Sequence, residues 1–312
     1  MALKQRQAVI DIGTLKVKSL LADFDLAGNI APIHKTNVLT CFGCSMLENN
    51  GRISPENLNA TIAEIINLLE IFANYQCGRI SIFATHALRD ASNKEEVLKE
   101  IRNKIGLEVK VLTPEAEGQL YFQAAVASLP AKQNFVVVDM GGGSCQVLFS
   151  EHQQLKQAYS FKTGGQLLHE RFTKDPHNPA SKNQPQDIAS IKQFLTQEYH
   201  DLPLNLGWPL VYGSSNVIDL MKAVNIPLED YFLSLAHPYK TYPNHLEDFI
   251  QSILPFSFAQ REQKYQFQEG YMWGVDKAFA NIITLAQRFA SHYIIHTNVS
   301  SLEGYLYKLN QV

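Results

Sequence analysis

The sequence of 312 residues lacks any apolar run close to the ~20 residues that a membrane-spanning helix requires. It also lacks an excess of basic residues, because 27 Lys and Arg stand against 30 Asp and Glu and the formal net charge is −3. A polyanionic ligand would therefore need a local cluster of cations. The N-terminus leads into an apolar strand without a signal-peptide pattern. We expect a cytoplasmic globular protein that has neither a membrane nor a nucleic acid as partner.

Cysteine is scarce as well, with four in the chain. Cys41 and Cys44 have the spacing of metal and redox pairs, but no second pair completes a zinc site. A redox pair usually opens a helix after a strand, whereas the polar segment Asn49–Gly51 follows here. We expect reduced thiols in the core or in a loop, with a metal or redox role as the alternative.

Solenoid repeats and low-complexity tracts are absent, and the length favours two domains over one core. The hydrophobic content of 46% and the mean hydropathy of −0.14 are typical of a soluble globular protein. Pro130 interrupts the pattern, which predicts one domain over residues 1–129 and another over residues 130–312. The last helix could pack back on the first domain. After Asn216 we expect further helix up to the long helical stretch Arg261–Phe289.

The most informative stretch is Phe135–Ser144. Four apolar residues, three of them valine, predict a fully buried strand that ends at Asp139. Gly141, Gly142 and Gly143 follow, and a glycine turn can press its backbone N–H groups against a ligand. An acidic side chain beside such a turn suits a phosphate that carries a divalent cation. An ordinary tight hairpin is the alternative.

A second copy of this pattern lies 128 residues upstream of the first, as the numbers of the two aspartates show. There an apolar strand contains Asp11 and leads into Gly13 and Thr14. Two such turns predict two similar halves that hold one phosphate chain. Lys16 and Lys18 leave the same face of the returning strand. We interpret them as cations for phosphate, with a solvated strand face as the alternative.

Three further segments carry polar residues that could bind a ligand, two of them directly after a strand, where α/β proteins bind ligands. Arg89 could hold a phosphate through two hydrogen bonds, or pair at the surface with an acid such as Asp90. Glu117 is in the first turn of a helix, where a purely structural carboxylate is also favourable. Gly213 and Ser214 form a third small polar turn that could contact a phosphate.

Four segments resemble the exopolyphosphatase/guanosine pentaphosphate phosphohydrolase (Ppx/GppA) family. They are the two Asp-Gly turns, the segment Ala84–Asn93 and the segment Thr113–Leu120. Paired Asp-Gly turns are also typical of the actin/Hsp70/sugar-kinase superfamily, of which this family is a branch. The resemblance implies an α/β fold of two actin-like (ribonuclease H-like) domains. Their mixed sheets would be flanked by helices, with an active-site cleft between the domains.

The resemblance also implies roles for residues. Glu117 would orient or deprotonate a water, and Arg89 would be a second catalytic residue that fixes the terminal phosphoryl group. Magnesium, or another divalent cation, would be held by Asp139 and Asp11. The predicted phosphate-binding residues are Asp11, Gly13, Thr14, Lys16, Lys18, Gly141, Gly142, Gly143, Ser144, Gly213 and Ser214.

The implied activity is release of terminal orthophosphate from its ligand, inorganic polyphosphate or guanosine pentaphosphate, a nucleotide of the stringent response. Several positions depart from the family pattern. Gln146 replaces a Glu, and Cys41 and Leu302 each replace an Arg. Leu15 and Lys16 stand in place of Asn-Ser, and Asn216 and Val217 stand in place of Gly-Thr. Lys16 could replace one of the lost cations. A non-catalytic sensor of these phosphates and a phosphotransferase of the same superfamily are therefore alternatives. The sequence leaves open whether the protein forms a homodimer.

Overall fold

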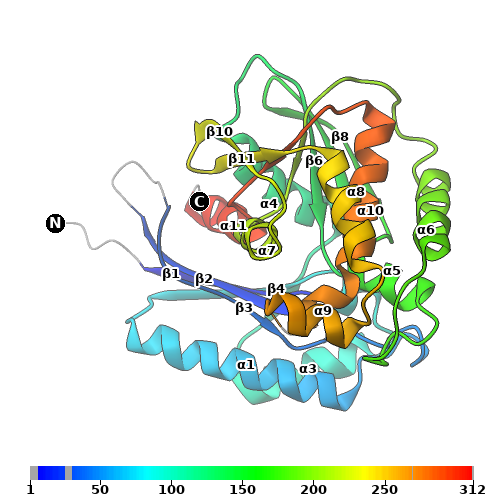
Figure 1. Cartoon of the computed structure of the whole chain (residues 1–312). Helices are drawn as coiled ribbons and strands as arrows, with labels where there is room; N and C mark the ends of the chain where they lie inside the picture. Colours follow the sequence, from blue (N-terminus) through cyan, green and yellow to red (C-terminus); the bar gives the residue numbers. More distant parts are fainter. Residues whose placement is uncertain (1–5, 25–29, 269, 311–312) are drawn as a thin grey trace. The chain divides into compact units, whose positions relative to one another are not determined.

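The computed structural model describes residues 6–24, 30–268 and 270–310 (Figure 1). The chain separates into two compact units. Unit 1 holds the described residues of Met1–Ala124 and of Ser300–Val312, and unit 2 is Ala125–Val299. The boundary predicted from the sequence follows residue 129, whereas unit 2 begins a few residues earlier, at Ala125. The last helix belongs to unit 1.

Unit 1 contains one mixed sheet and five helices within its described residues. Its strands are β1 (Gln7–Ile12), β2 (Lys16–Phe24), β3 (Ile30–Leu39), β4 (Arg79–Ala84) and β5 (Val109–Val111). Its helices are α1 (Pro55–Asn74), α2 (His86–Asp90), α3 (Lys94–Ile105), α4 (Pro114–Val126, whose last residues belong to unit 2) and α11 (Ser301–Asn310).

Strand β1 lies at the centre of the unit 1 sheet, whose order is β3-β2-β1-β4-β5. β1 pairs with β2 antiparallel and with β4 parallel. Side chains alternate across a strand, so Ile10 and Ile12 enter one apolar cluster while Val9 enters another on the opposite face. Asp11 shares the parity of Val9 and points to the side of the sheet that α11 covers.

Helices α1 and α3 cover one face of the unit 1 sheet, as Figure 1 shows. α1 has a capped start, because Ser54 Oγ accepts a hydrogen bond from Asn57 N at 3.2 Å and Pro55 occupies the first turn. The side chains of α1 in the shared apolar cluster are Ile62, Ile65, Leu68 and Phe72. Their spacing is that of one buried face of an amphipathic helix.

The opposite face is covered by α4 and α11. Leu302 and Leu306 of α11 lie in an apolar cluster with Val9 and Leu120. Gly304 permits this packing, because a Cβ there would lie 1.8 Å from the carbonyl oxygen of Leu120. Only glycine lets the two helices approach this closely.

Unit 2 contains one larger mixed sheet with six further helices among its described residues. Its strands are β6 (Phe135–Met140), β7 (Cys145–Glu151), β8 (Gln154–Phe161), β9 (Leu210–Tyr212), β10 (Glu229–Ser234), β11 (His237–Thr241) and β12 (Ile294–His296). Its helices are α5 (Gly165–Phe172), α6 (Pro185–Glu198), α7 (Ser215–Ala223), α8 (Pro243–Ile253), α9 (Phe258–Tyr265) and α10 (Tyr271–Phe289).

The two sheets repeat one topology. In unit 2 the order is β10-β11-β12-β9-β6-β7-β8, and its part β8-β7-β6-β9-β12 corresponds to β3-β2-β1-β4-β5 of unit 1. In both, the central strand is antiparallel to the next strand in sequence and parallel to the strand on its other side. This confirms the prediction of two related α/β halves with mixed sheets flanked by helices.

The segment after Asn216 corrects one expectation. Where helix was expected, the chain forms α7, then the hairpin β10–β11, and only then α8. Pro227, Pro238 and Pro243 exclude a continuous helix. β11 is stabilised by pairing with β12, a partner from much later in the chain that local periodicity does not reveal.

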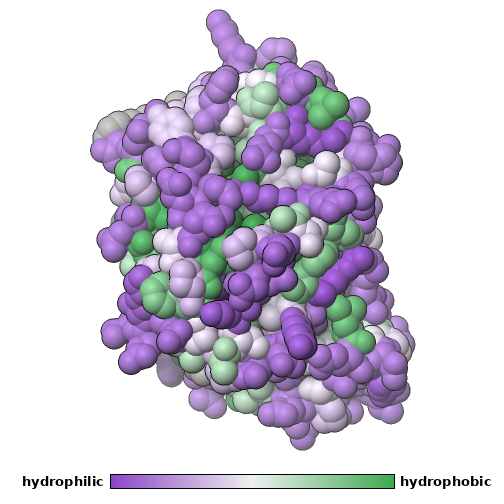
Figure 2. Space-filling view, turned by 45° about the vertical axis from the view of Figure 1, so that its right-hand side comes forward, coloured by the Kyte–Doolittle hydropathy of each residue, from purple (hydrophilic) through white to green (hydrophobic). Residues whose placement is uncertain are grey.

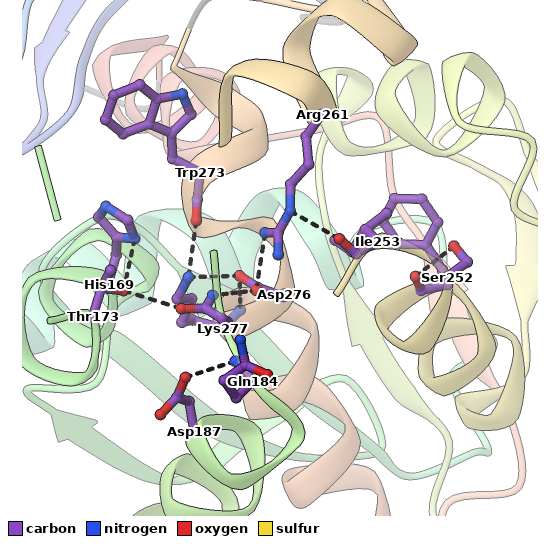
Figure 3. Close-up of polar contacts among 12 residues, drawn as sticks. His169, Thr173, Gln184, Asp187, Ser252, Ile253, Arg261, Trp273, Asp276 and Lys277 are labelled. Carbon is purple, nitrogen blue, oxygen red and sulfur yellow. Dashed lines mark hydrogen bonds and ion pairs between the residues drawn. The ribbon is translucent and has the colours of Figure 1, made fainter. Parts of the chain in front are cut away.

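The core of unit 2 contains a buried ionic cluster, which we call the Asp276 cluster: Arg261 of α9 with Asp276 and Lys277 of α10 (Figure 3). All three residues are 0% exposed. Arg261 Nη1 lies 3.0 Å from Asp276 Oδ2, and Lys277 Nζ lies 2.9 Å from Asp276 Oδ1. Burial alone would raise the pKa of Asp276, but the two cations outweigh it and lower the pKa to about 2. The cluster joins α9 to α10.

Polar side chains dominate the face that Figure 2 shows. On the face that Figure 2 shows, hydrophobic residues form small groups among hydrophilic ones. Within residues 6–24, 30–268 and 270–310, no helix combines the length and the apolar character needed to span a membrane.

Candidate functional site

The first Asp-Gly turn closes through one backbone hydrogen bond. Gly13 N donates to Lys16 O at 3.0 Å, and a Cβ at position 13 would lie 2.9 Å from the same oxygen. The turn therefore requires a glycine at its first position. Thr14 is buried at 8% exposure, and its carbonyl accepts a hydrogen bond from Gly43 N at 2.7 Å. The loop is thus fixed by a hydrogen bond within the turn and by another from Gly43 outside it.

Asp11 is the acidic residue of this turn, and it is 4% exposed. Its Oδ2 lies 3.9 Å from Lys18 Nζ, and Ser301 at the start of α11 donates a hydrogen bond to its side chain. Burial raises the pKa of Asp11, while Lys18 and Ser301 act in the opposite direction. Among the described residues, Oδ1 has no hydrogen-bond partner. This buried carboxylate oxygen is suited to a cation or to a water bound by one.

Lys16 lies at the end of the same turn and is only 6% exposed. Burial lowers its pKa to about 7, and the neighbouring charge of Lys18 contributes. A phosphate anion beside Lys16 would favour its protonated form. The structure thus places both predicted lysines at this turn, one buried and one half-exposed.

The segment after β4 brings the two predicted catalytic residues together. Thr85 N donates to Ile12 O at 3.4 Å, so this segment starts next to the first turn. Arg89 of α2 donates through Nη1 to Glu117 Oε2 at 3.1 Å and to Leu112 O at 2.9 Å. Its Nε also lies 3.8 Å from Asp90 Oδ1. Arg89 therefore positions Glu117, a contact that was not predicted from the sequence.

The second turn repeats the first. Gly141 N donates to Ser144 O at 3.0 Å, and each partner lies 128 residues after its counterpart in the first turn. The backbone hydrogen bonds of this turn, among described residues, use the N–H of Gly141 but not those of Gly142 and Gly143. These two N–H groups are suited to phosphate oxygens.

Helix α5 packs directly on the second turn. Gly165 N donates to Gly141 O at 3.0 Å, and Leu167 N donates to Gly142 O at 2.9 Å. A Cβ at Gly164 would lie 2.4 Å from the carbonyl carbon of Gly142. The sequence shows the glycine pair at 164 and 165, but only the fold reveals that it fixes the turn.

Asp139 and Gln146 stand opposite each other on the paired strands β6 and β7, as Asp11 and Lys18 do in unit 1. Gln146 is 1% exposed and donates through Nε2 to Ser144 Oγ at 3.0 Å. Its Oε1 has no hydrogen-bond partner among the described residues. Gln146 Oε1 is therefore an available hydrogen-bond acceptor in the site, a role that was not predicted from the sequence.

The third turn lies beside Asp139. Strand β9 pairs with β6 through Tyr212 and Val138, so Gly213 follows at the same edge of the sheet as Asp139. Gly213 has φ 118°, which favours glycine, and Ser214 precedes the first turn of α7. The second and third turns of unit 2 therefore lie next to each other at the same edge of the sheet.

The acidic residues do not form a complete metal cage. No group of three or more His, Cys, Asp or Glu in the described ranges could hold a metal ion. Mg²⁺ commonly uses only one or two carboxylates together with waters and substrate phosphates. The buried oxygens Asp11 Oδ1 in unit 1 and Gln146 Oε1 in unit 2 each lack a partner among the described residues, and each by itself is suited to be one ligand of this kind.

Two of the family departures have structural explanations. Leu302 is 1% exposed and packs in the apolar cluster of α11, so it contributes packing where the family has a cation. Glu303 next to it accepts from Ser300 N at 2.8 Å and pairs with Lys35 Nζ at 2.7 Å. Cys41 N donates to Leu15 O at 3.0 Å and lies against the first turn.

The chain is similar to known phosphatases in sequence. The model of the Ppx/GppA phosphatase family matches residues 24–308. Exopolyphosphatase 2 of Mycobacterium tuberculosis is 26% identical over 266 residues, which cover 82% of each protein. Exopolyphosphatase 1 of Mycobacterium bovis is 30% identical over 195 residues, which cover 62% of this chain and 55% of that protein.

Solved structures share the fold. The Ppx/GppA family member of Aquifex aeolicus has a TM-score of 0.76 at 22% identity, covering 98% of this chain and 97% of the other. An exopolyphosphatase from Cytophaga hutchinsonii has a TM-score of 0.82 at 18% identity, covering 98% of both chains. At these identities the two structures establish the fold of the chain and not its activity.

Proposed function

Because the chain belongs to the Ppx/GppA phosphatase family, we propose that it hydrolyses phosphoanhydride bonds. The proposed reaction releases terminal orthophosphate from inorganic polyphosphate or from guanosine pentaphosphate. Two relatives are named exopolyphosphatases, which favours polyphosphate as the first substrate to test.

The observation that carries the proposal is the fixed carboxylate of Glu117. It is 8% exposed, and Arg89 holds it through an ion pair of 3.1 Å while a second bond of the same nitrogen ties Arg89 to Leu112 O. A general base must be held in one position relative to the water that it activates. A buried carboxylate that is anchored in this way meets the requirement.

Each group has a definite task in the proposed reaction. A water oxygen attacks the terminal phosphorus, and the water proton passes to Glu117. The P–O bond to the rest of the substrate breaks, and the leaving phosphate keeps the electron pair. Lys16 and Thr14 of the first turn, and the N–H groups of Gly142 and Gly143, would hold phosphate oxygens.

We propose Mg²⁺, or another divalent cation, as cofactor. Asp139 and Gln146 Oε1 in unit 2, and Asp11 in unit 1, are the residues that would hold it or its waters. When bound, it would neutralise charge on the phosphate oxygens. Gln146 carries no charge, so we expect weaker metal binding than a carboxylate at this position would give.

The test compares orthophosphate release from long-chain polyphosphate and from guanosine pentaphosphate, each with Mg²⁺. Glu117→Gln keeps the shape of the side chain but removes the base, and we expect a loss of about 10²–10⁴-fold in turnover with substrate binding retained. Glu115→Gln is the matched control, because Glu115 is exposed in the first turn of the same helix and should change little. Unchanged turnover in Glu117→Gln would refute the proposed base.

A sensor function is the second candidate, and the neutral Gln146 and the buried Leu302 favour it. At both positions this chain has an uncharged side chain where the family pattern has a charged one. Polyphosphate or nucleotide binding without orthophosphate release, in the wild type as in Glu117→Gln, would support the sensor. Transfer of phosphate from ATP to an acceptor would instead indicate a phosphotransferase.

A further inference from the structure

The segment of Cys41 and Cys44 packs on the backbone of the first turn. Thr40 N and Cys41 N both donate to Leu15 O, at 3.1 and 3.0 Å, and Gly43 N donates to Thr14 O at 2.7 Å. A Cβ at Gly43 would lie 2.6 Å from Ala87 Cβ and 2.8 Å from Thr14 Cγ2. No spare space separates the segment from the turn, so a movement of one requires a movement of the other.

The two cysteines are close enough to be joined. Cys44 N donates to Cys41 O at 2.9 Å, which makes the four residues a hydrogen-bonded turn whose end Cα atoms lie within about 7 Å. Disulfides span about 4.4–6.8 Å between Cα atoms. Both residues carry thiols in this structure. The turn that joins the two residues therefore brings their Cα atoms to a separation compatible with a disulfide.

The two thiols differ in their access to solvent. Cys41 is half-buried, whereas Cys44 is only 8% exposed. Cys41 also has φ 51°, an uncommon left-handed conformation for a residue other than glycine. Cys41 is therefore the thiol that an oxidant would meet first.

We propose that Cys41 and Cys44 form a reversible disulfide that alters the first glycine turn and weakens its hold on phosphate. The effect on phosphate rests on the proposed function, whereas the disulfide and the change in the turn do not. The oxidant is a small-molecule disulfide such as glutathione disulfide.

The proposed oxidation consists of two thiol–disulfide exchanges. The Cys41 thiolate attacks one sulfur of glutathione disulfide, and one glutathione thiolate leaves. The Cys44 thiolate then attacks the Cys41 sulfur, and the second glutathione thiolate leaves. The protein loses two electrons and two protons, the protons pass to the two glutathione molecules, and glutathione disulfide is reduced. Added reduced glutathione reverses both steps.

The test treats the full chain with glutathione buffers of graded ratio and reads three quantities. We expect the protein to lose two of its four thiols, with a peptide that links positions 41 and 44. Hydrogen exchange at the amides of residues 13–16 should become faster. Affinity for inorganic polyphosphate should fall about tenfold, a typical size for coupling between sites.

Serine variants of the cysteines show which thiols cause the changes. Cys41→Ser and Cys44→Ser should each abolish the thiol loss and the change in exchange, while Cys77→Ser, outside this segment, should keep both. Four titratable thiols after oxidation, or a 41–44 disulfide with unchanged exchange at residues 13–16, would overturn the proposal. Absence of polyphosphate binding in the reduced protein would refute the proposed function, while thiol loss and exchange would still test the switch.

Discussion

Asp11 and Lys16 are two buried charged residues of the first turn whose surroundings disfavour their charged forms. Burial raises the pKa of Asp11 and lowers that of Lys16 to about 7. A divalent cation would favour the Asp11 carboxylate, and a phosphate would favour the Lys16 ammonium. A ligand of opposite charge would therefore stabilise the charged forms of these two buried residues more than it would stabilise those of exposed residues.

Lys16 provides a prediction at this scale. Its ammonium is present below pH 7 and is lost as the pH rises through about 7, so polyphosphate affinity should weaken over that range. One charged hydrogen bond corresponds to about a tenfold change. Titration of the affinity from pH 6 to pH 8 measures it. Lys16→Met should bind more weakly and lose this pH dependence, and the exposed Lys110→Met should retain it. A pH dependence that persists in Lys16→Met would contradict the assignment.

Among the elements, the short helix α11 stabilises the unit 1 site at more than one point. It supplies Ser301 to Asp11, and its Leu302 and Leu306 fill the apolar cluster beneath β1. Its closeness to α4 depends on Gly304, which packs against the backbone of Leu120. Glu117 lies in the first turn of α4. One helix from the end of the chain therefore supports both parts of the unit 1 site.

Gly304→Ala tests this packing. In an isolated helix the change would stabilise by about 1 kcal/mol, but here the new Cβ overlaps a backbone carbonyl. We expect a net loss of about 1–3 kcal/mol in the free energy of unfolding, with weaker phosphate binding. Denaturant unfolding measures the loss, and Lys308→Ala on the exposed side of α11 is the control. A stability gain in Gly304→Ala would show that α11 does not pack as described.

At the scale of the whole chain, each unit has its own apolar core, and unit 2 adds the Asp276 cluster. Removing one partner of a buried ion pair leaves an uncompensated charge, which costs far more than losing an exposed pair. The cluster therefore makes the stability of unit 2 depend on one carboxylate. The hydrogen bond from Asn183 to Asp276 extends this dependence to the loop before α6.

Asp276→Asn should destabilise unit 2 by roughly 3–5 kcal/mol, because Arg261 and Lys277 lose their counter-charge. Hydrogen exchange in unit 2 would report the loss, and the exposed Asp201→Asn is the control. The pKa of Asp276 is lowered to about 2, so its contribution is present above about pH 4 and is lost as the pH falls from about 4 to about 2. The variant should lack this acid-dependent part. Equal stability of the two variants would refute the role of the cluster.

Features that depend on neighbouring residues were predictable from the sequence. The two glycine turns follow buried strands, because apolar runs and glycines specify strand and turn locally. The capped start of α1 and its buried stripe were predictable for the same reason. The matching spacing of the two turns was enough to predict two related halves.

Contacts between residues far apart in the sequence became visible only in the folded structure. Arg89 and Glu117 form a pair across two helices, and Ser301 reaches Asp11 from the end of the chain. The hairpin β10–β11 was missed because β12 completes it from a distant segment. Burial of Lys16 and the closeness of α11 to α4 likewise depend on packing. Such contacts arise from the summed burial of segments far apart in sequence, which no local pattern contains.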